Sequence, residues 1–224
     1  MVRDDFDWAT VAAFRVIIIF SLWMLVACDS VKPYPESVVE YGSHVSTEEL
    51  RIIGAMPVQV VRFADAGGKY MLAMQKTEYS EITEEMETKE IRLFARLYSI
   101  KDAGNKINKV WEIKDSVVCT GLDIEADFFT SATSITDLNN DGLSEVTVAY
   151  KMFCGGGVDP KEIKVIMRNG MDKYAIRGES LIAVEGNPPY GGTRRVDAAL
   201  LAAPKSFMTH LDKTWQAIYV ERLP

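Results

Sequence analysis

The sequence predicts a mainly β protein, a β-rich α+β fold in which antiparallel sheets of hairpins are followed by a C-terminal α-helix. From residue 146 to 152 apolar side chains alternate with other residues, which is the period of a strand. Asn169-Gly170 separates two strand-like runs and favours a tight hairpin turn between them. Helical spacing of apolar residues is found between Phe207 and Ile218, with Pro204 suited to the first turn.

The first elements of the domain are a short helix and a hairpin. Ser46, with Glu49 three positions later, predicts a capped helix that ends near Gly54. Strands are expected over residues 58–63 and 69–74, because the glycines between them suit a hairpin turn.

Further strands are expected over residues 91–98 and 110–113, where β-branched and aromatic residues are frequent. Residues 77–90 hold six glutamates. This composition is typical of a solvated loop or of exposed strand edges, and we expect one of these here.

The composition divides the chain into three segments. Residues 1–27 have the features of a signal peptide, and residues 28–56 those of a tether in which Pro33 and Pro35 disfavour regular structure. Residues 57–224 are expected to form a single β-rich globular domain.

The signal segment ends in Leu25-Val26-Ala27-Cys28, after an uncharged run of twelve residues from Val16 to Ala27. A helix of that length is too short to cross a bilayer, which takes about 20 residues. The four residues resemble the lipobox of bacterial lipoproteins, which implies cleavage before Cys28 and a diacylglycerol on its sulfur. Asp29 resembles an inner-membrane retention signal, so the inner membrane is favoured over the outer one.

The residues before this run carry three aspartates and two arginines, whereas a signal peptide begins with net positive charge. A later translation start, for instance at Val11, would leave Arg15 as the positive end. The alternative is an uncleaved anchor or a buried apolar segment.

The net charge is −7. An acidic chain is a poor match for nucleic acid and for anionic lipid, so we expect neither as a partner bound by charge. The membrane is expected to be a partner through the lipid anchor alone.

Once Cys28 carries lipid, two of the three cysteines remain, Cys119 and Cys154. An even remainder in an oxidising compartment predicts a disulfide between them. The alternative is a metal pair, but the short Cys-x-x-Cys spacing and neighbouring histidines of zinc sites are missing.

A calcium loop is predicted over residues 137–145. Calcium takes six to eight oxygens, best supplied by a loop that alternates ligands with spacers. Asp137, Asn139 and Asp141 offer side-chain oxygens, Leu143 offers its carbonyl, and Glu145 closes the shell directly or through water.

The loop departs from the EF-hand, whose closing glutamate stands at the twelfth position, here Val148. It resembles the strand-flanked Asp-x-Asn-x-Asp-Gly loops of integrin-like FG-GAP repeats, which use the ninth position. The alternative is an ordinary Asn-Asp-Gly turn. We expect a structural ion that braces, together with the disulfide, one part of the sheet.

A longer ordered set of segments is similar to a family of bacterial envelope proteins labelled surface polysaccharide biosynthesis proteins. The likeness covers roughly residues 108–180 and rests on residues 111–115, the calcium loop, Tyr150-Lys151 with Cys154, residues 158–160 and residues 173–178. It implies an envelope context but carries over no catalytic residue.

No catalytic motif is present, and His44 and His210 are both expected at the surface. We therefore expect a non-enzymatic, calcium-stabilised binding or accessory module, anchored to a membrane and facing the periplasm. Its partner would be an envelope protein or polysaccharide, with roles in surface polysaccharide biogenesis or hydrolase inhibition. The alternative is a carboxylate-dependent enzyme of envelope polysaccharide metabolism, recognisable by two carboxylates about 5–9.5 Å apart across a cleft.

Overall fold

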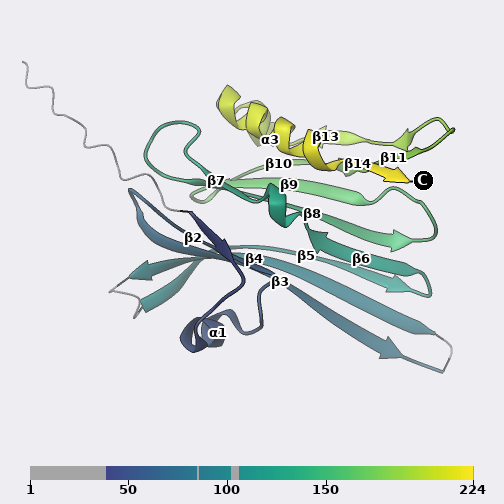
Figure 1. Cartoon of the computed structure of the whole chain (residues 1–224), viewed down its shortest axis with the longest axis horizontal. Coiled ribbons are helices and arrows are strands. Elements are labelled where there is room, and N and C mark those ends of the chain that lie inside the picture. Colours follow the sequence, from purple (N-terminus) through teal and green to yellow (C-terminus); the bar gives the residue numbers. More distant parts are fainter. Residues whose placement is uncertain (1–38, 85, 102–105, 224) are drawn as a thin grey trace, which may run out of the picture. The chain divides into compact units, whose positions relative to one another are not determined.

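A computed structural model describes residues 39–84, 86–101 and 106–223 (Figure 1). The signal peptide predicted at 1–27, the lipid site at Cys28 and the first part of the 28–56 tether lie outside the described residues. Among those described, no helix is long and apolar enough to span a membrane.

The described part of the predicted tether belongs to the folded domain. Strand β1 (Glu40–Gly42) pairs with β2 (Gln59–Asp65), and Ile53 of helix α1 (Thr47–Ile53) is buried. The capping box is confirmed, because Ser46 Oγ accepts the Glu49 N–H and Glu49 Oε2 accepts the Ser46 N–H. The domain therefore begins before residue 57.

The first sheet has five antiparallel strands in the order β1-β2-β3-β4-β5. Its three long members are β3 (Gly68–Ile82), β4 (Glu87–Lys101) and β5 (Lys106–Thr120). The acidic stretch at 77–90 is the far end of the β3–β4 hairpin, paired as far as Ile82 and Glu87. It is therefore mostly strand rather than loop.

The second sheet runs β13-β10-β9-β8-β6, with β7 also paired to β8. Its strands are antiparallel. They are β6 (Asp123–Phe128), β7 (Ser134–Thr136), β8 (Glu145–Gly155), β9 (Glu162–Asn169), β10 (Asp172–Glu179) and β13 (Arg194–Val196). A short 3-10 helix, η2 (Thr130–Ala132), lies between β6 and β7.

A third, small sheet has the order β12-β11-β14, in which β11 and β14 are parallel. It consists of β11 (Leu181–Val184), β12 (Tyr190–Gly191) and β14 (Val220–Leu223). Helices α2 (Ala198–Leu201) and α3 (Lys205–Ile218) precede β14. The predicted β-rich fold with antiparallel sheets and a C-terminal helix is confirmed.

The second sheet is buried on both faces at its central strand, because the side chains of β8 alternate between two cores. Val146, Val148, Tyr150 and Met152 pack with the first sheet. Ala149, on the opposite face, packs with residues of α3, including Phe207, Leu211 and Trp215. Each fully buried apolar side chain contributes about 1.5–3 kcal/mol. Strand β8 is thus the central element to which the first sheet and α3 both pack.

Candidate functional site: the loop before β8

The predicted calcium loop connects β7 to β8, and its own aspartates shape it. Asp137 accepts the N–H of Asp141 at 3.1 Å and that of Gly142 at 3.0 Å. Asp141 Oδ1 accepts the Leu143 N–H at 2.8 Å. Asn140 and Gly142 have φ angles of 58° and 82°, which reverse the chain over a short distance. The side chains of Asp137 and Asp141 therefore lie inside the turn.

Asn139 lies in the same turn. Its Oδ1 accepts the Asp141 N–H at 3.2 Å, and its Nδ2 donates to Asp141 Oδ2 at 2.8 Å. The Asn139 amide thus holds Asp141 in place through both of its polar atoms.

Glu145, the first residue of β8, is the unusual group of the site. It is 0% exposed. Its Oε2 accepts the Leu138 N–H at 2.7 Å, whereas Oε1 is buried without a hydrogen-bond partner in the described structure. Burial raises the pKa of the Glu145 carboxyl, and the charges of Asp137 and Asp141 raise it further. The carboxyl group of Glu145 is therefore buried near the exposed carboxylates of Asp137 and Asp141.

No group of three or more His, Cys, Asp or Glu side chains in the described part of the chain is arranged to hold a metal ion. In the loop, hydrogen bonds to backbone N–H groups occupy both oxygens of Asp137 and one of Asp141. The predicted calcium ligands also include the side-chain oxygen of Asn139 and the backbone carbonyl of Leu143. Neither belongs to the His, Cys, Asp and Glu side chains that make up such a group. Each carboxylate oxygen that accepts one hydrogen bond keeps a second lone pair for a cation.

The loop is also bonded to the first sheet. Asp65, at the end of β2, accepts the Ser144 N–H at 2.9 Å and the Gly67 N–H at 2.7 Å. The Ala66 N–H donates to the Gly142 carbonyl at 2.9 Å. The β2–β3 turn and the loop before β8 thus form one hydrogen-bonded unit. Sequence reasoning missed Asp65, because an aspartate before Ala-Gly-Gly indicates only a local turn.

Cys119 of β5 and Cys154 of β8 are joined by a disulfide, with Cα atoms 5.4 Å apart. This bond links the first sheet to the second. The expectation that ion and disulfide brace one part of the sheet was wrong. Strand β6 runs antiparallel to β8, from the level of Cys154 towards Tyr150. The chain that follows Cys119 therefore runs away from the disulfide before the loop begins. The two sites lie at opposite ends of β8, about 30 Å apart along nine residues.

His210 is not the surface residue that the sequence predicted. Its Nε2 lies 3.1 Å from both Ser134 Oγ and Thr147 Oγ1, and Thr147 is buried. Burial lowers the pKa of His210, and the positive charge of Lys213 lowers it further. The helix turns His210 onto the sheet because residue 210 flanks the apolar stripe of Phe207 and Leu211. His44 is exposed, as expected.

Comparison with protein-family models, with curated proteins and with solved structures finds no match.

Proposed function

We propose that this protein is a lipid-anchored component of the bacterial cell envelope whose β domain is a calcium-stabilised binding module without catalytic activity. Cys28 carries the anchor and the domain faces the periplasm. The observation that supports the calcium role best is the fully buried Glu145, which lies near the charges of Asp137 and Asp141 and whose Oε1 has no hydrogen-bond partner among the described residues.

The physical reason is the cost of burying charge. An ionised carboxylate without a partner is expensive in a protein interior, and the charges of two further carboxylates in the same nine-residue loop add to that cost. A calcium ion would offset both costs, because it prefers carboxylate, amide and carbonyl oxygens. Asp137, Asn139, Asp141, the Leu143 carbonyl and Glu145 supply these types.

The ion would have a structural role. The hydrogen bonds of the loop hold the β2–β3 turn through Asp65 and Gly142. Calcium would thus fasten the two sheets together at this end of β8. In an extracytoplasmic compartment, a site with a dissociation constant near ~10⁻⁴ M would be filled.

Thermal unfolding of the full-length protein in calcium and in EGTA tests this proposal. The melting temperature should be higher in calcium, and Asp137→Asn should remove the difference while the protein still folds. Asp172→Asn, at the exposed first residue of β10, is the matched control and should keep the full calcium response. Identical melting curves in calcium and in EGTA would contradict the proposal.

The anchor has a separate test. The intact mass of protein extracted from membranes should correspond to a chain that begins at Cys28 and carries acyl groups. A mass that retains residues 1–27 without acyl chains would overturn the lipoprotein assignment.

One observation favours the enzymatic alternative. Glu162 and Glu179 are directly opposed across β9 and β10, and both line a cavity of about 600 Å³. However, both are exposed, Glu162 lies 3.1 Å from Lys164 Nζ, and Glu179 accepts the Thr193 hydroxyl at 3.0 Å. A general acid usually depends on a drier, more apolar setting. Release of reducing ends from an acidic oligosaccharide, lost in Glu162→Gln and Glu179→Gln, would establish the enzyme instead.

A further inference from the structure

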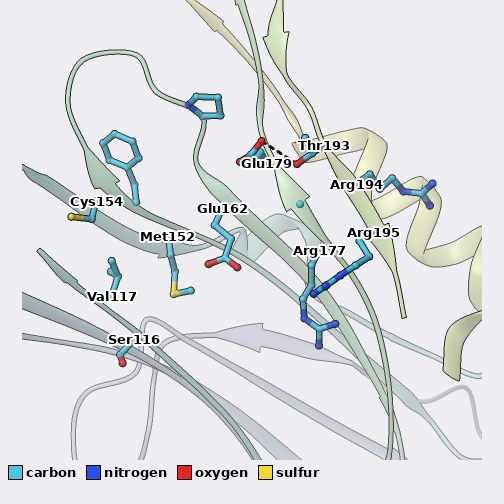
Figure 2. Close-up of a pocket in the computed structure, with 13 residues that line it drawn as sticks. Ser116, Val117, Met152, Cys154, Glu162, Arg177, Glu179, Thr193, Arg194 and Arg195 are labelled. Carbon is cyan, nitrogen blue, oxygen red and sulfur yellow. Dashed lines mark hydrogen bonds between the residues drawn. The ribbon is translucent and has the colours of Figure 1, made fainter. Parts of the chain in front are cut away.

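The cavity of about 600 Å³ lies between the edge strand β5 and the second sheet (Figure 2). Ser116 and Val117 of β5 form one wall, and Met152 and Cys154 of β8 line the cavity opposite them. The disulfide from Cys119 to Cys154 holds these two walls together. The volume of the cavity is within the range of small-molecule sites, about 300–1,000 Å³.

A row of cations crosses the sheet at this cavity. Lys164 of β9 is the register partner of Arg177 of β10, and Arg177 is the partner of Arg195 of β13. Directly opposed residues share a face of the sheet, with Cβ atoms about 5 Å apart, and like charges in that position destabilise a sheet. Figure 2 shows the side chains of Arg177 and Arg195 next to each other in the cavity wall.

Protein carboxylates neutralise only part of this row. Lys164 Nζ lies 2.7 Å from Asp115 Oδ2, and Arg177 is paired with Asp197. Arg195 is exposed and forms no ion pair with any residue the structure describes, although the chain as a whole is acidic. The guanidinium of Arg195 is thus available to an anion in the cavity.

A second row, two residues further along β10, consists of hydrogen-bond acceptors. Glu162 and Glu179 are register partners there, and the Thr193 hydroxyl donates to Glu179 at 3.0 Å. The spacing between the rows is about 6.6 Å along the strand, comparable with the width of one sugar ring. The cavity therefore presents cations on one side and carboxylate acceptors on the other.

We infer that this cavity binds an acidic saccharide, with the carboxylate of a uronate-type ring on Arg177 and Arg195 and the ring hydroxyls donating to Glu162 and Glu179. Arginine pairs with carboxylates through parallel N–H donors, which suits the first row. A bare phosphate would satisfy the cations, but its negative charge would lie beside the two glutamates, and it lacks the ring whose hydroxyls extend from the first row to the second. The inference gives a ligand class to the proposed binding role and rests on that role.

The test is calorimetric titration of the full-length protein in detergent with digalacturonic acid, cellobiose and inorganic phosphate. Digalacturonic acid should bind at least tenfold more tightly than the other two, and its affinity should fall as salt rises. Arg195→Gln should weaken it about tenfold or more, because a charge-assisted pair is lost. Arg195 is exposed and unpaired among the described residues, and its removal relieves repulsion with Arg177, so this variant should melt at or above the wild-type temperature.

Arg51→Gln is the matched control, on an exposed arginine of α1 far along the chain from the cavity residues, and should bind like the wild type. No binding of digalacturonic acid, equal binding by Arg195→Gln, or phosphate binding as tight as that of digalacturonic acid would each overturn the inference. The titration is run in saturating calcium, and the calcium response of the melting temperature is measured without sugar. Absence of sugar binding would therefore leave the calcium proposal standing. Absence of a calcium response would likewise leave the sugar site to be judged by the titration.

Discussion

The two ends of strand β8 join the same two sheets by different chemistry. At the Glu145 end the links are hydrogen bonds from the β2–β3 turn, centred on a loop rich in carboxylates. At the Cys154 end the link is a covalent bond to β5. One junction should therefore respond to calcium and pH and the other to reductant. The proposed saccharide cavity lies at the covalent end, where the disulfide joins β5 and β8.

The largest effect is expected from the covalent end. Replacing both Cys119 and Cys154 by alanine should lower the free energy of unfolding by about 3–4 kcal/mol, because closing a loop of this length restricts the unfolded chain. Urea unfolding measures the loss. Peptide mapping of exported protein without reductant should show the single crosslinked pair. Two freely alkylated thiols in natively folded protein would refute the covalent junction.

The calcium end should give a smaller and reversible effect. At a calcium concentration a hundredfold above Kd, binding to the folded state stabilises it by about 2.7 kcal/mol. Glu145→Gln removes a buried charge, so in EGTA the variant should equal or exceed the wild type in stability. In calcium the wild type should become the more stable protein. Absence of this crossover in urea unfolding would argue against an ion at Glu145.

Substitution of Asp65 tests the hydrogen bonds between the loop and the first sheet. Asp65→Ala removes the acceptor of the Ser144 and Gly67 N–H groups and should cost about 1–3 kcal/mol. Because the same contacts fix the loop, the calcium-dependent rise in melting temperature should shrink as well. A variant that loses stability but keeps the full calcium response would separate this contact from the ion site.

The smallest effect concerns pH. Burial lowers the pKa of His210 in the folded protein, so the neutral imidazole is favoured there. Its contribution to stability is complete above the unfolded value of about 6.5 and is lost as the pH falls from there towards the folded pKa. His210→Gln should therefore flatten the decline in stability between pH 7 and pH 5. Parallel pH profiles for the two proteins would show that His210 does not titrate in this window.

Local patterns predicted the local elements well. The capping box of Ser46 and Glu49, the hairpin at Asn169-Gly170 and the helix from Phe207 to Ile218 are all present. Each depends on residues close in sequence, where backbone propensity and side-chain period act directly.

The remaining features depend on contacts between distant segments. The pairing of β1 with β2, the bonds of Asp65 to the loop and the burial of His210 against Thr147 join residues 18 to 79 positions apart. No local pattern specifies such partners. The cation row of Lys164, Arg177 and Arg195 was missed for the same reason, because it exists only once three strands are placed in register.

Calcium binding itself tests the central claim most directly. Calorimetric titration of the calcium-free, full-length protein should show one ion bound per chain with micromolar to submillimolar affinity. The site should be lost in Glu145→Gln and retained in the exposed control Glu81→Gln. Absence of binding at millimolar calcium, or equal binding by the Glu145→Gln variant, would contradict the account.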